Sequence, residues 1–242
     1  MTKKFVKVLC SFGILFFISN LSHAASVTGT VKWEGPVPNL KPINMSADVI
    51  CAGKYKGKDP AKSQVLSLGD GNTMGNILVK VKSGLPAGKT YTAPTETLEV
   101  NQNGCMYEPH VFAVMQGQPI KFLNSDGTKH NVHALPSINR QFNITMPKTM
   151  TESAVKSFKE KECSPFRVKC DIHPWMVSYA CVMDHPFFAV TKKDGTFKID
   201  NLPAGTYELE AWHEKAGTRT ASVTVTDADS KEVSFTFSKG KK

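Results

Sequence analysis

The sequence predicts an all-β protein made of β-sandwich or barrel modules. Apolar and polar residues alternate over many short runs, which is the pattern of strands with one buried face. Turn signals separate these runs, and the chain holds 17 Gly and 14 Pro. A chain of 242 residues is long enough for one large domain or two small ones. Many short strands are therefore favoured over long helices.

The alternation defines the expected strands in chain order. They cover residues 27–33, 77–81, 197–199, 207–211 and 233–237. Residues 151–162 fit a helix and a strand about equally well. Residues 36–70 alternate less and are rich in Lys, Pro, Gly and Ser, so we expect a long surface excursion that is held somewhere by Cys51.

Residues 1–24 have the features of a secretory signal peptide. Three lysines precede a mostly apolar run, and the small residues Ser22 and Ala24 precede the expected cleavage point. The run is short for a membrane span, so we expect no span after cleavage, with an uncleaved anchor as the alternative. Cys10 lies inside the run, which disfavours a lipid anchor. The segment predicts a periplasmic or secreted protein.

The charge of the chain disfavours nucleic-acid binding. The net charge is +9 and falls to +6 without residues 1–24, which carry three lysines and no acid. The most basic segments, residues 54–58 and 239–242, are short, and no long basic run is interleaved with aromatic residues. We expect no nucleic-acid partner.

Cleavage after residue 24 also leaves an odd number of cysteines. The five are Cys51, Cys105, Cys163, Cys170 and Cys181. In an oxidising compartment cysteines pair as disulfides. One of the five is therefore a free thiol, or a thiolate held by another group.

The densest chemistry lies in residues 170–176, which read Cys-x-x-His-x-x-Met, with His130 forty residues upstream. Thiolate and thioether sulfurs favour copper(I), and imidazole also suits copper(II). Two His and one Cys in a plane, with a weak axial Met, therefore suit a copper ion that changes its oxidation state. A loop with three ligands can close on a fourth that a rigid sheet already holds.

Other chemistries fit these residues less well. Structural zinc would leave Met176 without a role, and the sequence has no Cys-x-x-Cys of the haem-attachment or thioredoxin type. A Cys170 nucleophile with a histidine base would also leave Met176 unused. The plainest alternative makes Cys170 a disulfide partner and His173 a surface residue.

Residues 98–183 resemble the cupredoxins, and the amicyanin-like and plastocyanin-like members in particular. The resemblance rests on the strand pattern of residues 111–126, on His130-Asn131-Val132, and on the short Cys-x-x-His-Pro-x-Met loop. It implies a Greek-key β-sandwich that binds one type 1 copper ion. The implied ligands are His130, Cys170, His173 and Met176.

The resemblance also implies roles for residues beside the ligands. Asn131 would tie the two ligand-bearing loops together. His130 is preferred to His133 because the family's ligand precedes an Asn, and because the two side chains would lie on opposite faces of a strand. Pro174 has no N–H to donate to the Cys170 sulfur, which favours copper(II).

Trp175 is a candidate for docking a partner. With Pro174 it would surround an exposed edge of His173 with an apolar patch, and electron transfer uses small, weak interfaces. Ordinary core packing is the alternative for Trp175. The remaining histidines, His110, His185 and His213, are expected to be surface or hydrogen-bonded residues rather than a second metal site.

If Cys170 binds copper, four cysteines remain, and three pairings are open to them. A bridge between Cys163 and Cys181 would brace the ligand loop that these residues flank. Cys51 and Cys105 would then form the second bridge.

Residues 188–209 resemble the carboxypeptidase regulatory-like domain, a small transthyretin-like β-sandwich, but lack its first strands. Residues 27–31 and 75–81 resemble those strands. We therefore expect a cupredoxin domain inserted into a split sandwich, with three consecutive modules as the alternative. The expected segments are a signal peptide (1–24), the first part of the sandwich with its excursion (25–94), the cupredoxin domain (95–184), the second part of the sandwich (185–238) and a basic tail (239–242).

The sequence thus predicts a mononuclear blue-copper protein that carries single electrons and is not an enzyme. The resemblance implies a redox protein as partner, such as a c-type cytochrome or another periplasmic oxidoreductase. The alternative is a non-enzymatic copper-binding module for storage, delivery or sensing, which would use the same residues.

Overall fold

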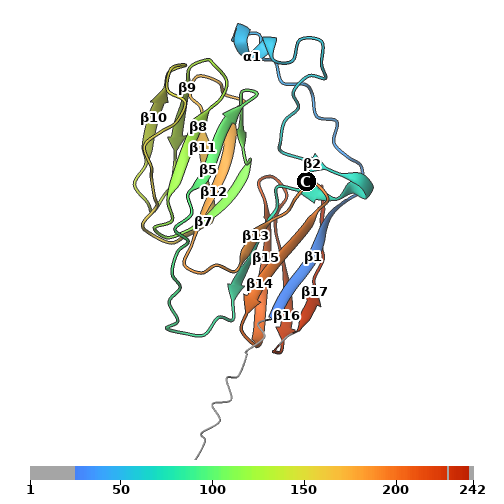
Figure 1. The fold of residues 1–242 in the computed structure, drawn as a ribbon. Helices are drawn as coiled ribbons and strands as arrows, with labels where there is room; N and C mark the ends of the chain where they lie inside the picture. The colour runs from blue at the N-terminus through green and yellow to red at the C-terminus, as the bar shows by residue number, and fades with distance from the viewer. Residues whose placement is uncertain (1–24, 228, 240–242) are drawn as a thin grey trace, which may run out of the picture.

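The computed structural model describes residues 25–227 and 229–239, and strands dominate this part of the chain. Figure 1 shows two separate bodies of strands. The predicted all-β class, with two sandwiches, is confirmed. No helix in the described ranges is long and apolar enough to cross a membrane. The predicted signal peptide at residues 1–24, and residues 240–242 of the basic tail, lie outside the described residues.

The first body, here called the central sandwich, is formed by eight consecutive strands. They are β5 (Leu98–Asn103), β6 (Met106–Glu108), β7 (Val111–Met115), β8 (Ile120–Asn124), β9 (His130–Ala134), β10 (Phe142–Met146), β11 (Glu162–Lys169) and β12 (Val177–Met183). One sheet has the order β10-β9-β11-β12-β7, and the other has the order β6-β5-β8. Val100 and Phe122 of the smaller sheet share one buried core with Val132 and Val168 of the larger.

Two strand pairs in the central sandwich are parallel, namely β12 with β7 and β5 with β8. Parallel neighbours need a crossover connection, whereas a tight hairpin produces an antiparallel pair. The chain therefore passes between the two sheets, as in a Greek-key sandwich.

The second body, here called the composite sandwich, combines strands from both ends of the chain. They are β1 (Ala25–Glu34), β4 (Leu78–Ser83), β13 (Phe188–Val190), β14 (Thr196–Leu202), β15 (Gly205–His213), β16 (Gly217–Val225), β17 (Ser230–Glu232) and β18 (Phe235–Ser238). One sheet has the order β13-β4-β15-β16, and in the other β1 pairs with β14, β17 and β18. The register sets Gly29 opposite Phe197 and Val79 opposite Ala211.

The two sandwiches meet through a small apolar cluster and several polar contacts. Leu78 of β4 packs with Val111, Cys181 and Met183 of the central sandwich. Lys80 Nζ lies 3.2 Å from a Glu210 carboxylate oxygen and donates to the carbonyl of Cys163. β4 is the last strand before the chain enters the central sandwich, and β12 is the last strand before the chain leaves it.

The excursion between β1 and β4 begins as an irregular segment and carries the one α-helix of the described residues, α1 (Val49–Gly53). A disulfide joins Cys51 of α1 to Cys105, so the excursion is held by Cys51 as the sequence predicts. Its later part contains β2 (Ser67–Leu68), a short 3-10 turn η1 (Asp70–Asn72) and β3 (Met74–Gly75). Figure 1 shows α1 beside the upper end of the central sandwich, away from the composite sandwich.

Residues 151–161 form neither the helix nor the strand that their sequence is compatible with. They run as an irregular strap with isolated bridges from Glu152 to Leu123 and from Lys156 to Ile120, and β11 begins at Glu162. The hydroxyl of Ser153 accepts a hydrogen bond from the Phe122 N–H at 3.0 Å. The strap therefore satisfies backbone groups at the edge of β8.

The predicted bridge between Cys163 and Cys181 is wrong for this structure, where both residues are free thiols. The residues lie on the adjacent strands β11 and β12, and each sulfur has contacts of its own. The Cys181 Sγ lies 3.3 Å from the Cys163 carbonyl oxygen and 3.4 Å from the Met183 Sδ, and the Cys163 Sγ lies 3.9 Å from the Val182 carbonyl oxygen. The spacing of the two cysteines is compatible with neighbouring strands, but a disulfide also requires a specific geometry of the two side chains, which the spacing does not determine.

Candidate metal centre

The predicted ligands lie at one end of the central sandwich, where two connections approach one another. His130 is the first residue of β9, and Cys170 directly follows β11. The loop to β12 is closed by two backbone hydrogen bonds, from the Cys170 N–H to the Met176 carbonyl at 3.1 Å and from the Met176 N–H to the His173 carbonyl at 2.9 Å. The strands thus fix both ends of a tight loop that carries three of the four predicted ligands.

Three of the predicted ligands form a compact buried cluster. The Nδ1 atoms of His130 and His173 lie 2.9 Å apart, and the Sγ of Cys170 lies 3.8 Å from Nδ1 of His173. The potential ligand atoms of the three residues all lie within 4.8 Å of one another. The exposed fractions of His130, Cys170 and His173 are 0%, 1% and 2%. The cluster is therefore sealed from bulk water.

These separations are compatible with donors that share one transition-metal ion. Nitrogen donors about 2.0 Å from an ion and at roughly right angles lie about 2.9 Å apart, and a thiolate about 2.3 Å from the ion, at roughly 120° to a nitrogen, lies about 3.7 Å from it. Two imidazole lone pairs that face each other at 2.9 Å repel unless a proton or a cation lies between them. The donor set is soft and mixed, as copper prefers.

The outer nitrogen of each imidazole faces a carboxylate. His130 Nε2 lies 2.9 Å from Asp126 Oδ2, and His173 Nε2 lies 3.1 Å from Asp48 Oδ2. An Nε2–H that donates to a carboxylate leaves Nδ1 as the lone-pair nitrogen, turned toward Cys170. Lys54 forms an ion pair with the other oxygen of Asp126 at 2.9 Å. Carboxylates therefore orient both rings for binding through Nδ1.

Neither carboxylate is among the residues that the sequence predicts. Asp126 lies four residues before His130, and this short spacing is a local signal that could have identified it. Asp48 is separated from His173 by 125 residues. No local pattern connects them, because the contact depends on where the excursion folds back.

Met176 is fully buried and belongs to the same hydrophobic cluster as Cys170. Backbone hydrogen bonds tie Met176 to Cys170 and to His173. Its assignment as the axial ligand stays a prediction.

Asn131 contacts both connections that carry the predicted ligands. Its Oδ1 accepts a hydrogen bond from the Asp171 N–H at 2.7 Å and lies 3.3 Å from the Cys170 Sγ. His133 does not join the cluster, because its Nδ1 lies 2.9 Å from Asp171 Oδ2 on the more exposed side of the strand. The backbone alternation along β9 therefore separates the two histidines.

The electrostatics of the cluster favour a charged pair in the metal-free protein. Burial lowers the pKa of His130, but hydrogen bonds with Asp126 and Cys170 outweigh burial and raise the pKa to about 9. Burial raises the pKa of Cys170, but hydrogen bonds from His130 and from backbone N–H groups outweigh it and lower the pKa. Burial lowers the pKa of His173. The first two shifts favour the charged forms of both groups, an imidazolium at His130 and a thiolate at Cys170.

His173 and Trp175 differ from the expectation of an exposed imidazole edge. The His173 ring is buried because Asp48 and Cys51 lie against its outer side, with Cys51 Sγ 3.9 Å from Nε2. Trp175 is half-buried, its ring centroid lies 5.0 Å from that of His173, and its indole N–H donates to the Cys105 carbonyl at 3.0 Å. Pro174 is exposed, as a patch residue would be. The expected patch around an open His173 edge is therefore wrong, because the edge is covered.

The remaining histidines have partners of their own. His110 Nε2 lies within hydrogen-bond distance of Glu214 Oε1, at 2.5 Å, while His185 and His213 bond to backbone carbonyl oxygens at 3.1 Å and 2.7 Å. The other groups in the described residues that could hold an ion overlap with the cluster and include Cys51 or Cys105. These two sulfurs form the disulfide and offer no thiolate.

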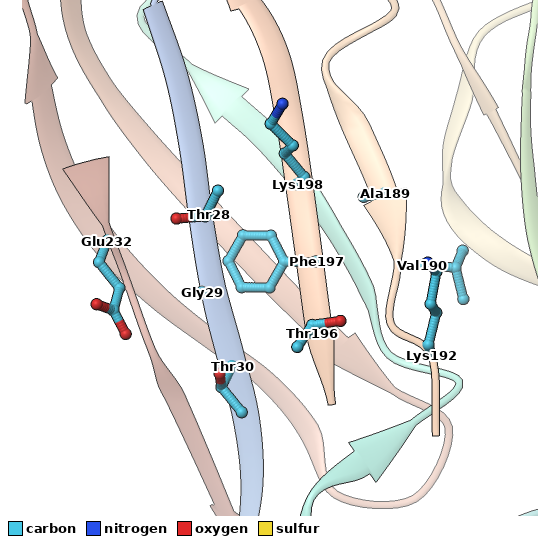
Figure 2. A pocket seen from close by; sticks show the side chains of 10 residues that line it. All are labelled: Thr28, Gly29, Thr30, Ala189, Val190, Lys192, Thr196, Phe197, Lys198 and Glu232. Carbon is cyan, nitrogen blue, oxygen red and sulfur yellow. The ribbon is translucent and has the colours of Figure 1, made fainter. Parts of the chain in front are cut away.

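A pocket of about 530 Å³ lies in the composite sandwich and contains no residue of the ligand loop. Figure 2 shows that its wall combines small polar residues of β1 with residues of β13 and β14. The ring of Phe197 and the side chains of Lys198 and Glu232 are among the lining groups. None of the predicted ligands lines this pocket.

The C-terminal segment matches a known family. The family model of the carboxypeptidase regulatory-like domain covers residues 184–238, which confirms the resemblance predicted for this segment. No curated protein sequence matches the chain.

Similar solved structures include amicyanins, which are cupredoxins. An amicyanin variant with Cu(I) has a TM-score of 0.32 and 18% sequence identity, over 45% of this chain and 99% of that chain. An oxidised amicyanin variant has a TM-score of 0.32 and 19% identity, over 45% and 99% of the two chains. The copper-containing nitrite reductase from Thermus scotoductus SA-01 has a TM-score of 0.31 and 18% identity, over 43% of this chain and 26% of that chain.

Proposed function

We propose that the protein binds one type 1 copper ion and carries single electrons between redox proteins of the periplasm. The observation that supports this most is the buried cluster in which two Nδ1 atoms at 2.9 Å and one thiol converge. Copper bound there would supply a couple that gains and loses one electron. His130, Cys170 and His173 would be its principal ligands, with Met176 as the weak fourth.

The residues of the chain would keep this centre rigid. The carboxylates of Asp126 and Asp48 hold the two imidazoles through Nε2. The short loop and its backbone hydrogen bonds hold the sulfur of Cys170. A centre whose ligands hardly move between oxidation states needs little reorganisation when an electron arrives or leaves.

The burial of the cluster supports a carrier rather than an enzyme. A catalytic metal keeps an open position for substrate or water. His130, Cys170 and His173 are each at most 2% exposed, so a substrate has no direct access to them. An electron carrier needs no such access, since it must only bring its centre close to another redox group. A c-type cytochrome or a periplasmic oxidoreductase fits this role as a partner.

The test is to titrate metal-free protein with copper(II) and to record its absorption and EPR spectra. A thiolate ligand should produce an intense visible charge-transfer band and a narrow parallel hyperfine splitting, both of which a Cys170→Ser variant should lose. Cys163→Ser is the matched control, because Cys163 is a free cysteine outside the cluster and its removal should leave both signals. Colourless binding, or binding of copper(I) alone, would favour storage, delivery or sensing of copper instead.

A further inference from the structure

The excursion lies over the ligand end of the central sandwich and packs into its core. Met45 and Cys51 are buried in the same cluster as Cys170, and Tyr55 packs against it. The Tyr55 hydroxyl donates to the Gly104 carbonyl at 2.9 Å. Together with the disulfide from Cys51, these contacts fix residues 43–55, here called the cap, to the sandwich.

Asp48 lies at the start of α1 within the cap, and donors surround its carboxylate. Oδ1 accepts from the backbone N–H groups of Ile50 and Cys51 at 2.8 and 2.9 Å, as an N-cap residue does. Oδ2 accepts from the Thr128 hydroxyl at 3.0 Å and from His173 Nε2 at 3.1 Å. These donors fix the orientation of the Asp48 carboxylate, and the fixed carboxylate in turn restrains the orientation of the His173 ring.

We propose that Asp48 is the positioning residue for His173 and that the cap seals the outer edge of this imidazole. The inference rests on the proposed copper function and adds a role for a segment outside the ligand loop. His130 obtains its carboxylate from Asp126 in the connection just before β9, whereas His173 obtains its own from the excursion of the other sandwich. The ligand loop, residues 170–176, therefore has a carboxylate partner for His173 only when the cap is in place.

The cap also determines what an approaching redox partner meets. The His173 edge is covered, whereas the neighbouring Trp175 ring is half-buried and its centroid lies 5.0 Å from that of the imidazole. Trp175 lines a cleft of about 400 Å³ that also contains Arg167, Tyr179 and Glu214. Electrons would enter and leave beside Trp175 or across the cap, and copper would be retained because no ligand edge is open to a chelator.

The first test uses the metal-free protein and the accessibility of His173 to diethyl pyrocarbonate, read residue by residue with mass spectrometry. Asp48→Ala should clearly speed the modification of His173, because it removes the carboxylate that lies against the Nε2 edge of the ring. Asp48→Asn keeps the N-cap oxygen but turns an amide NH2 toward His173 Nε2, so it should also speed the modification while the start of α1 stays capped. Asp59→Ala removes an exposed carboxylate of the same excursion and should change nothing.

The second test loads the same proteins with copper and measures the transfer of copper to a chelator, together with the reduction potential. Asp48→Ala should release copper about 10-fold to 100-fold faster, and Asp48→Asn, which keeps the N-cap oxygen but loses the acceptor for His173, should also release it faster than the original protein. A Cys51→Ser/Cys105→Ser double variant should also release copper faster, because it loses the covalent anchor of the cap.

The two proposals can fail separately. If the unmodified protein lacks the thiolate charge-transfer band, the copper proposal fails, whatever the cap does. If that band is present but Asp48→Ala matches Asp59→Ala in His173 modification, copper release and potential, the role of Asp48 is contradicted. Circular dichroism of each variant identifies any loss of fold.

Discussion

At the residue scale, the centre depends on which nitrogen each imidazole turns inward. In both His130 and His173 the Nε2 atom faces a carboxylate and the Nδ1 atom faces the cluster. A histidine whose outer N–H is held by a carboxylate is fixed in both tautomer and orientation. Asn131 adds a restraint by binding the Asp171 N–H beside Cys170. The residues around the ligands therefore prearrange the centre.

A second buried carboxylate, Glu162 at the start of β11, links stability to pH. It is 3% exposed and accepts backbone N–H groups from Ser137, Ile138 and Asn139 at 2.6 to 3.2 Å. Burial raises the pKa of Glu162, but these donors outweigh burial and lower it below its ordinary value of 4.5. Because the folded pKa is below the unfolded one, the stabilisation is complete above about pH 4.5 and is lost as the pH falls through the folded pKa.

We predict that Glu162→Gln lowers the free energy of unfolding at pH 7 by about 1–3 kcal/mol, because the amide cannot accept all these hydrogen bonds. The difference from the original protein should shrink below pH 4.5. Denaturant unfolding of metal-free protein between pH 3 and pH 7 measures it. Glu160→Gln is the control, since Glu160 is exposed. A Glu162→Gln penalty that stayed constant over this pH range would contradict the assignment.

At the element scale, the chain shows what local sequence can and cannot predict. The ligand loop could be predicted because its seven residues contain three of the four predicted donors at a short, regular spacing. The contact of Asp48 with His173 could not, because it depends on a long excursion and a disulfide 54 residues apart in sequence. The wrong Cys163–Cys181 bridge has a similar cause: spacing put both on neighbouring strands, but side-chain direction is set by packing.

Strand β1 contains a glycine that tests its contact with the C-terminal strands. A Cβ on Gly29 would lie 1.8 Å from the Val233 carbonyl oxygen and 2.7 Å from the Phe197 ring. We predict that Gly29→Ala lowers the free energy of unfolding by about 1–3 kcal/mol or more, because the crowded backbone must move. Gly53→Ala, where a Cβ meets open space, should change stability by less than about 1 kcal/mol. Equal effects in denaturant unfolding would contradict this packing of β1.

At the scale of the whole molecule, the central sandwich lies in the sequence between two sets of strands that pair with each other. β4 precedes it and β13 follows it, and these two strands are antiparallel neighbours. The core of the composite sandwich includes Val27, Val31 and Val79 from the first set, and Leu209 from the second. We propose that neither set folds alone, because each lacks part of the apolar core.

We predict that residues 187–242 expressed alone remain unfolded, with poor proton NMR dispersion and no cooperative thermal transition. A chain that joins residues 25–94 to residues 187–239 through a short Gly-Ser linker should regain cooperative unfolding, since β4 and β13 lie side by side. A stable, cooperatively unfolding fragment of residues 187–242 would instead support consecutive modules.

The proposed copper centre is tested most directly by X-ray absorption at the copper edge of protein loaded with one equivalent of copper. The geometry of His130, Cys170 and His173 predicts a first shell of two imidazole nitrogens and one short thiolate sulfur. The sulfur contribution should disappear in Cys170→Ser and persist in Cys163→Ser. A shell of nitrogen and oxygen atoms alone in the unmodified protein would contradict the account.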